Sequence, residues 1–396
     1  MADCHIGAWR DPKLKDLSMQ AFIKAVDISL EKKVDFILIS GDLFNTSMPG
    51  IDYLKLTTKK LKQIKEKDVP VYIIPGSHDQ SPSGKTMLDV LEEAGLVINV
   101  FKGHVDDGKL NLEFTRDKKT GTLITGILGK RGMLERKYYE DLDKENLESA
   151  PGTKIFMFHT ALTELKPEEM EQMDSNPVSF LPKDFEYYAG GHVHIVRNET
   201  LKGYKNIVYP GPLMPANFSE LEKLKHGSFY IYNHGKLEMI TIELVKVYPL
   251  QIDANDRTPE EINDLMYQAL KGRDFANTIV LIRVFGKLKH GKPTDVNFQD
   301  VFNKLNEQKA FFVMKSTTKL TSEEFEEIKI DSTSVEDVEE SVFKEHLGQI
   351  KTSFSDNEET IAKELMKTLS EEKHEGEKVY EYEERVKKEI EKLLGI

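Results

Sequence analysis

The sequence predicts an α/β fold of mixed β-sheets flanked by helices, followed by a smaller α/β domain and a helical C-terminal region. Three observations support this. Over the first hundred residues, short apolar runs rich in Ile and Val alternate with amphipathic stretches. From about 154 to 235, apolar runs are separated by loops that contain Pro and Gly. After about 331, apolar residues recur at helical spacing in an acidic background. Layers of sheets with helices outside suit the first 245 residues.

The first hundred residues contain three expected helices. Ser18 could cap the first, with Phe22 and Val26 on its apolar face. The second is expected at about 53–64. The third is expected at about 86–93 and ends at Gly95. Residues 110–130 look like paired strands with a turn at 118–121.

A domain boundary is expected near 244–250. After it, Thr258 and Pro259 followed by two glutamates form a typical helix start. A strand at 279–285, a helix at 296–307 and a strand at 311–314 would complete a unit of βαβ size. We therefore predict three regions: a catalytic domain over 1–245, a small α/β capping domain over 246–330, and an acidic helical region over 331–396.

Composition excludes some classes of protein. The net charge is −13, and residues 331–396 hold 19 acidic against 10 basic residues, so the acidity is concentrated at the C-terminal end. An acidic chain is a poor general binder of nucleic acid, although a local basic stripe or a metal-mediated phosphate contact remains compatible with it. The single Cys4 rules out an internal disulfide. With no apolar segment of membrane-spanning length and no signal peptide, we expect a cytoplasmic protein without a membrane contact.

Five segments of the chain place metal-binding side chains at or next to short apolar runs. These side chains are Asp3 with His5, Asp42, Ser77 with His78 and Asp79, His159, and His192 with His194. In layered α/β folds, ligands collect outside the carboxyl ends of the strands. The five segments together predict one pocket of N and O ligands that holds two metal ions.

Each segment alone has a plainer explanation. Asp3 and His5 could be a surface pair, although in an extended segment residues i and i+2 point the same way and can share an ion. Asp42 could be an ordinary turn residue rather than a bridging carboxylate, and His159 could be structural. Their joint occurrence favours the metal site. His78, beside Asp79, could donate a proton to a leaving oxygen.

Imidazole nitrogens and carboxylate oxygens, without a thiolate, favour Mn²⁺, Fe or Zn²⁺ over Ca²⁺ as the bound metal. We expect two Mn²⁺ ions per chain. Two ions about 3.5–4 Å apart suit hydrolysis of phosphate esters, because they hold both the attacking and the leaving oxygen.

The ordered motifs Asp-x-His, Gly-Asp, Gly-x-His-Asp, His and Gly-His-x-His resemble those of the calcineurin-like metallophosphoesterases. Residues 41–44, 190–194 and 208–211 are similar to the nuclease subunit of the DNA double-strand-break repair complex, the SbcD and archaeal Mre-eleven family. The resemblance covers about 1–245 by motif and continues more loosely into the small domain. It implies a metallophosphoesterase sandwich and a DNA exonuclease and endonuclease that processes DNA ends.

The resemblance also implies roles for residues and partners. One ion would be held by Asp3, His5, Asp42 and His194, and the other by Asp42, Ser77, His159 and His192. His78 would lie by the scissile phosphate, oriented by Asp79. The small domain would contact DNA, and the C-terminal helices would dock the coiled coil of an SMC-like ATPase of the SbcC type. Helices of the first hundred residues would form a homodimer.

Three features depart from the family pattern. Ser77 stands where the family usually has Asn, which would weaken the second ion site. Asn45 stands where relatives often carry His or Asp. Only two residues precede Asp3, where relatives have a whole strand, so this start looks truncated. Ser77 and the short start favour one alternative function, a DNA-end scaffold with weakened catalysis. A related phosphoesterase acting on small nucleotide diesters is a second alternative.

Overall fold

The computed structural model describes residues 1–81, 84, 86–322, 361, 364–365, 368–369 and 379–394. The chain divides into two compact units, Met1–Val247 and the residues from Tyr248 onward. The predicted division at 330, like most of the predicted region 331–396, falls outside the described residues and stays a prediction. Within the described ranges, no helix has the length and apolar character that a membrane crossing requires.

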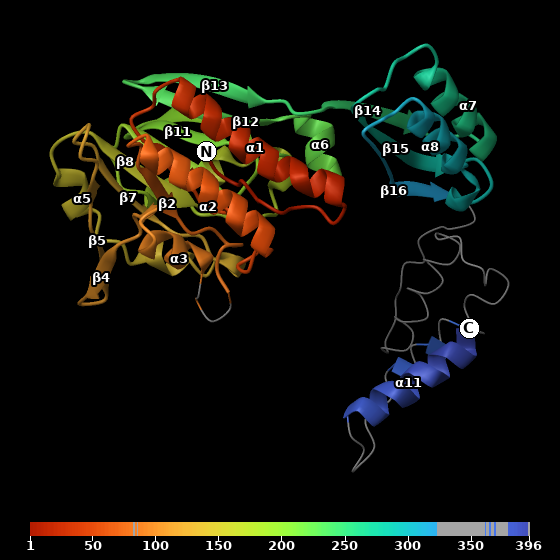
Figure 1. The fold of residues 1–396 in the computed structure, drawn as a ribbon, viewed down its shortest axis with the longest axis horizontal. Coiled ribbons are helices and arrows are strands. Elements are labelled where there is room, and N and C mark those ends of the chain that lie inside the picture. The colour runs from red at the N-terminus through yellow and green to blue at the C-terminus, as the bar shows by residue number, and fades with distance from the viewer. Residues whose placement is uncertain are drawn as a thin grey trace. The chain divides into compact units, whose positions relative to one another are not determined.

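A three-stranded parallel sheet opens the first unit, in the order β1 (Ile37–Ser40), β2 (Val71–Ile74), β3 (Ile98–Asn99). Helices α1 (Pro12–Glu31), α2 (Ile51–Glu66) and α3 (Met87–Glu93) alternate with these strands, and α1 and α2 run side by side (Figure 1). β1 and β2 are apolar runs of the sequence, and each is followed by a loop that carries polar side chains. These loops therefore meet at one edge of the sheet.

The start of α1 differs from the prediction. The helix begins at Pro12 with Asp11 as its cap, and the Asp11 carboxylate accepts hydrogen bonds from the backbone N–H groups of Lys13 and Leu14. Ser18 lies inside the helix, where its hydroxyl donates to the carbonyl of Lys15. An Asp-Pro pair is a stronger helix start than a lone Ser, because it supplies both a cap and a preset first residue.

A six-stranded mixed sheet forms the second layer. Its order is β10 (Val196–Leu201), β11 (Tyr204–Pro210), β9 (Tyr187–Gly191), β8 (Lys154–His159), β7 (Leu123–Ile127), β6 (Thr115–Arg116). The four central strands pair in parallel, and the two edge strands are antiparallel. Two hairpins complete the strands of this unit: β4 (Gly103–Asp106) with β5 (Lys109–Leu112), and β12 (Gly227–Asn233) with β13 (Lys236–Ile242). Short helices α4 (Arg136–Glu140), α5 (Glu145–Ser149) and α6 (Phe218–Leu224) lie in the connections.

The two sheets pack face to face. One buried cluster joins Tyr72 and Ile74 of β2 to Ile155 and Met157 of β8. A second cluster, with Phe156 at its centre, covers the other face of the larger sheet. Burying each of these large side chains contributes about 1.5–3 kcal/mol to folding. The predicted α/β sandwich of mixed sheets and helices is confirmed.

The second unit contains a small α/β fold. Its sheet has the order β14 (Lys246–Asp253), β15 (Thr278–Leu288), β16 (Phe312–Ser322), and β15 and β16 are parallel. Helix α7 (Pro259–Leu270) begins with a capping box formed by Thr258 and Glu261, and α8 (Phe298–Glu307) crosses from β15 to β16. The later helix α11 (Val379–Leu394) carries apolar residues at helical spacing.

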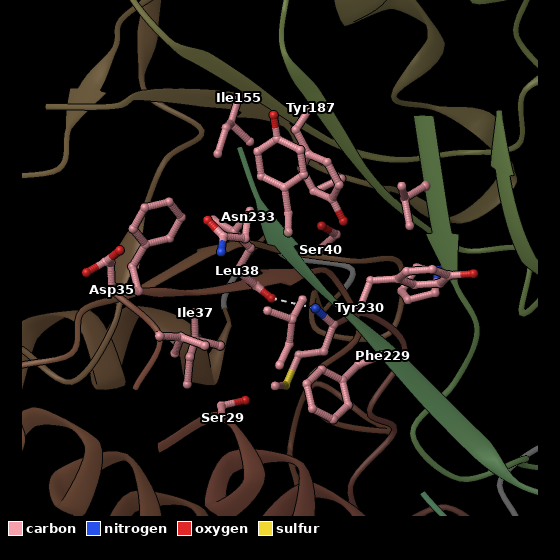
Figure 2. A pocket seen from close by; sticks show the side chains of 18 of the residues that line it. Ser29, Asp35, Ile37, Leu38, Ser40, Ile155, Tyr187, Phe229, Tyr230 and Asn233 are labelled. Atoms are coloured by element: carbon pink, nitrogen blue, oxygen red, sulfur yellow. Dashed lines mark hydrogen bonds between the residues drawn. The ribbon is translucent and has the colours of Figure 1, made fainter. Parts of the chain in front are cut away.

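A pocket of about 240 Å³ lies between β1 and β12, and Figure 2 shows the side chains that line it. At its edge Met1 pairs with β1: its amino group donates to the Leu38 carbonyl at 2.9 Å, and its carbonyl accepts from the Ser40 N–H at 3.0 Å. The chain then follows the end of β1, where the Asp3 N–H donates to Gly41 and the His5 N–H to Asp42. These backbone bonds fix the first two predicted metal ligands beside the loop that carries the third.

Candidate metal centre

All seven predicted metal ligands come together at the carboxyl ends of the strands. Asp42 follows β1, Ser77 follows β2, His159 ends β8, and His192 and His194 follow β9. Asp3 and His5 join them from the start of the chain. Apart from His192 and His194, which are partly exposed, all of these residues are buried. A group of buried acids and imidazoles requires positive charge or metal to be stable.

The Asp42 carboxylate lies at the centre of the group. Its Oδ2 is 3.2 Å from Nε2 of His159 and 3.7 Å from Nε2 of His5. The Ser77 hydroxyl donates to the same oxygen at 3.5 Å, while Oδ1 accepts the backbone N–H of His78 at 2.7 Å. One carboxylate oxygen is therefore shared by His159, His5 and Ser77, which is what a bridging ligand requires.

Potential ligand atoms gather into three overlapping sets, in each of which they lie within 4.8 Å of one another. The sets are Asp3, His5, His194; His5, Asp42, His78; and Asp3, Asp42, His159. Nε2 of His5 and Nε2 of His194 are only 2.9 Å apart, and Asp3 Oδ1 is 3.7 Å from the latter. Spacings of this kind allow several atoms to bind one ion.

Carbonyl or carboxylate partners fix the orientation of two imidazoles. Nδ1 of His159 is 2.8 Å from the Ser40 carbonyl, and Nδ1 of His194 is 2.9 Å from Oε1 of Glu220. In both rings this leaves Nε2 directed at the acids, which is the arrangement found in ligating histidines. Glu220, on α6, was missed by the sequence analysis. Asn217 and Glu220 have the spacing of a helix cap, but nothing in the sequence links them to a histidine 26 residues away.

One buried ring nitrogen supports occupation of the site by a metal. Nε2 of His159 lies 3.2 Å from Oδ2 of Asp42 but makes no well-aligned hydrogen bond to any described residue. A buried polar atom without a partner costs about 1–3 kcal/mol. A metal ion beside the Asp42 carboxylate would satisfy Nε2 of His159, so the residues present fit the ion that such a donor set implies.

The pKa values of the four candidate metal-binding histidines fall into two groups, one lowered and one raised. Burial lowers the pKa of His5 to about 3 and that of His192 to about 4, so both are neutral and keep a lone pair for an ion. Burial acts in the same direction on His159, but the Asp42 carboxylate outweighs it and raises the pKa to about 10. Burial is likewise outweighed at His194, where Glu220 raises the pKa to about 9. Metal must displace protons from these last two rings.

Backbone conformation at the ligands differs from the prediction. Asp3 and His5 do not lie in an extended segment, because their φ angles are 49° and 41°. Asp42, His192 and His194 also have positive φ, at 52°, 100° and 50°. Such conformations cost about 1–3 kcal/mol each for residues other than glycine, and they cluster at functional sites. The ligands converge through left-handed turns, a feature that side-chain spacing could not reveal.

The side chains of His78 and Asp79 contact different groups. Nδ1 of His78 is 2.9 Å from the backbone carbonyl of Asn45. The buried carboxylate of Asp79 accepts the backbone N–H groups of Gly76, Leu43 and Phe44, at 2.9, 3.3 and 3.1 Å. Asp79 thus joins the loops after β1 and β2, and the Asn45 carbonyl contacts the His78 ring. The predicted orientation of His78 by Asp79 stays a prediction.

Comparison with known proteins identifies the family of the domain that carries this site. Residues 1–196 match the family model for calcineurin-like phosphoesterases. They form a calcineurin-like phosphoesterase domain. The predicted resemblance is confirmed, and this domain is the metal-dependent phosphoesterase of the chain.

The chain is also similar to archaeal proteins over most of its length. It is 25% identical to the DNA double-strand break repair protein Mre11 of Methanococcus maripaludis, covering 87% of this chain and 89% of that protein. Identity to the Mre11 protein of Sulfurisphaera tokodaii is 26%, covering 100% and 96%. Identity to that of Archaeoglobus fulgidus is 24%, covering 75% and 69%. The similarity thus extends beyond the phosphoesterase domain.

Proposed function

We propose that this chain is a Mn²⁺-dependent DNA nuclease that processes DNA ends in double-strand-break repair. The observation that carries the proposal is the Asp42 carboxylate, which belongs to two overlapping sets of potential metal ligands and has His5 and His159 beside the same oxygen. Phosphodiester hydrolysis is the chemistry that paired divalent ions serve best. The repair function is supported by the named Mre11 relatives, which align with 75–100% of the chain.

In this proposal the ligands divide between two Mn²⁺ ions. One set is Asp3, His5, Asp42 and His194, and the other is Asp42, Ser77, His159 and His192. When bound, the two ions supply positive charge that holds the attacking and leaving oxygens of an in-line displacement. Mixed N and O donors without a thiolate are consistent with Mn²⁺.

His78 would act on the scissile phosphate. The Asn45 carbonyl holds Nδ1 of the ring, so Nε2 is left to meet a substrate oxygen. A proton held at Nε2 can pass to the leaving oxygen, which contributes typically 10²–10⁴-fold to a rate. Asp79 acts indirectly, because its bonds to three backbone N–H groups fix the loop that carries His78.

The test is cleavage of linear DNA in Mn²⁺, compared with His78→Ala. The expected loss is at least about 100-fold, while His104→Ala, an exposed histidine on β4, keeps full activity. Full activity of His78→Ala would remove His78 from the mechanism. DNA-end binding without Mn²⁺-dependent cleavage would favour a scaffold. Efficient turnover of small diesters without DNA binding would favour the small-nucleotide phosphoesterase.

A homodimer is the second part of the proposal. Met48, Ile51 and Leu56, at and just before α2, are 80%, 82% and 43% exposed. These exposed apolar side chains, close together in the sequence, are the contacts we propose for the dimer. Ile51→Asp should convert the dimer into a monomer in analytical ultracentrifugation, whereas Val105→Asp, an exposed apolar residue on β4, should not. A wild-type chain that is monomeric at all concentrations would contradict the dimer.

The third part concerns the SMC-like ATPase of the SbcC type. We propose that it binds the acidic region 331–396, of which the structure describes the amphipathic helix α11. Deletion from residue 331 should abolish binding of the ATPase subunit in a pull-down and leave DNA cleavage intact. Binding that survives the deletion would show that the docking segment lies elsewhere.

A further inference from the structure

A large apolar pocket opens directly beside the metal centre. Its volume is about 660 Å³, within the 300–1,000 Å³ range of small-molecule sites. Asp42, Ser77, His78, His192 and His194 form one side of it. Anything bound at the ions therefore borders this pocket, and the remaining walls decide what kind of group fits there.

Three segments supply those walls. The first is the stretch around the short 3-10 helix η3 (Glu168–Met170), with Pro167, Met170 and Met173. The second is the start of β10, with Ile195 and Val196, and the third is the C-terminal half of α6, with Leu224. Met173 and Val196 are each 38% exposed, so apolar atoms face the pocket without being covered.

An ion pair links two of these walls. Nζ of Lys223 on α6 contacts Oε2 of Glu169 in η3, 54 residues away in the sequence. Both side chains are more than half exposed, so the pair contributes little to stability, about 0–1 kcal/mol. Its effect is positional, because it joins the Met-bearing segment to the helix that carries Glu220.

Two cations, Arg197 and Lys223, also line the pocket, but each is paired with an acid, Glu199 and Glu169 respectively. The part of the walls left for a ligand is therefore mainly apolar. The ions and His78 account for the phosphate, and a stacked duplex presents mainly phosphates and sugars, with its base faces covered by neighbouring bases. An apolar, thioether-bearing surface suits the face of an aromatic ring, since sulfur makes favourable contacts with rings. A nucleobase can reach it only after it has left the stack.

We propose that this pocket binds the unstacked nucleobase of the nucleotide next to the scissile phosphate, with Met170 and Met173 as its principal contacts. The inference rests on the proposed nuclease function and narrows its substrate to single-stranded or frayed DNA ends. Thioether and aliphatic groups contact the face of a ring rather than its edge, so the pocket accepts purines and pyrimidines alike.

The kinetic test uses the whole protein with Mn²⁺ and single-stranded oligonucleotides that carry either a normal or an abasic nucleotide at the scissile bond. The wild type should show about a tenfold higher KM for the abasic substrate, which corresponds to about 1.4 kcal/mol of lost binding. The double variant Met170→Ser, Met173→Ser should cleave both substrates with the same raised KM. Met239→Ser, on β13, is the matched control and should behave like the wild type. Equal KM values for the two substrates in the wild type would overturn the proposal.

A binding test that needs no turnover separates the inference from the nuclease function. In protein labelled with ¹³C at the methionine methyl groups, thymidine 5′-monophosphate should shift the signals of Met170 and Met173, while inorganic phosphate and the Met239 signal serve as controls. Shifts at Met170 and Met173 with the nucleotide alone support the pocket even if no DNA is cleaved, an outcome in which only the nuclease function fails. Cleavage of DNA with no nucleotide-specific shift refutes the pocket and leaves the nuclease function standing.

Discussion

Replacing Glu220 by Gln removes a negative charge from the edge of the metal centre and keeps the size of the side chain. Glu220 lies 2.9 Å from Nδ1 of His194, and its own position is fixed by the backbone N–H of Ala216 and the side chain of Asn217. The carboxylate favours a proton on Nδ1, which leaves Nε2 of His194 with a lone pair for an ion once its own proton has left. An amide at the same place holds this orientation less strongly.

The expected magnitude follows from the geometry. A hydrogen bond to a charged group contributes about 1.5–3 kcal/mol, but the Glu220 side chain is 20% exposed, so water screens part of it. Loss of an outer partner of a ligating histidine typically lowers metal affinity 10–100-fold. We expect Glu220→Gln near the lower end of that range, with the pKa of His194 falling from about 9 toward its ordinary value.

The assay is Mn²⁺ binding by competition with a chelator, accompanied by NMR titration of the histidines in metal-free protein. Glu31→Gln, exposed at the end of α1, is the control for a general loss of negative charge. Unchanged Mn²⁺ affinity in Glu220→Gln would show that His194 needs no outer partner, and the orientation argument would be refuted.

Three further predictions concern the same centre. Gly76→Ala should destabilise the protein by about 1–3 kcal/mol in urea denaturation, because the new Cβ would lie 2.3 Å from the backbone N of Asp42. Gly50→Ala, whose nearest neighbour is 3.6 Å away, is its control. Metal binding should release protons near pH 7, because the pKa values of His159 and His194 are raised to about 10 and about 9. Affinity should therefore rise with pH up to about 10, and calorimetry in buffers of different ionisation enthalpy measures the protons released. A pH-independent affinity would contradict it. Ser77→Asn should bind the second ion more tightly in a Mn²⁺ titration, since the amide oxygen reaches further than the hydroxyl; weaker binding would show that Ser77 is not a ligand.

Sequence reasoning succeeded where local chemistry determines position. His159 and His192 end or follow neighbouring parallel strands of the larger sheet, and parallel strands bring their carboxyl ends to one edge. Asp42 follows β1 of the smaller sheet, so it joins them only because the two sheets pack face to face. The helix start at Thr258 was likewise readable, because a capping box is complete within four residues.

The remaining features depend on contacts between distant segments. Glu220 and the Asn45 carbonyl act on histidines 26 and 33 residues away, through backbone positions that no local pattern encodes. The positive φ angles at Asp3 and His5 arise because the chain must turn both side chains into one site. The apolar pocket combines η3, β10 and α6, so its existence follows only from the folded chain.

The central claim is that these strand-end residues hold two ions that share the Asp42 carboxylate. Crystals grown with Mn²⁺ and measured at the manganese absorption edge test it most directly. We predict two anomalous peaks per chain, about 3.5–4 Å apart, with Asp42 between them. A single peak, or two peaks that do not both contact Asp42, would contradict the two-metal site.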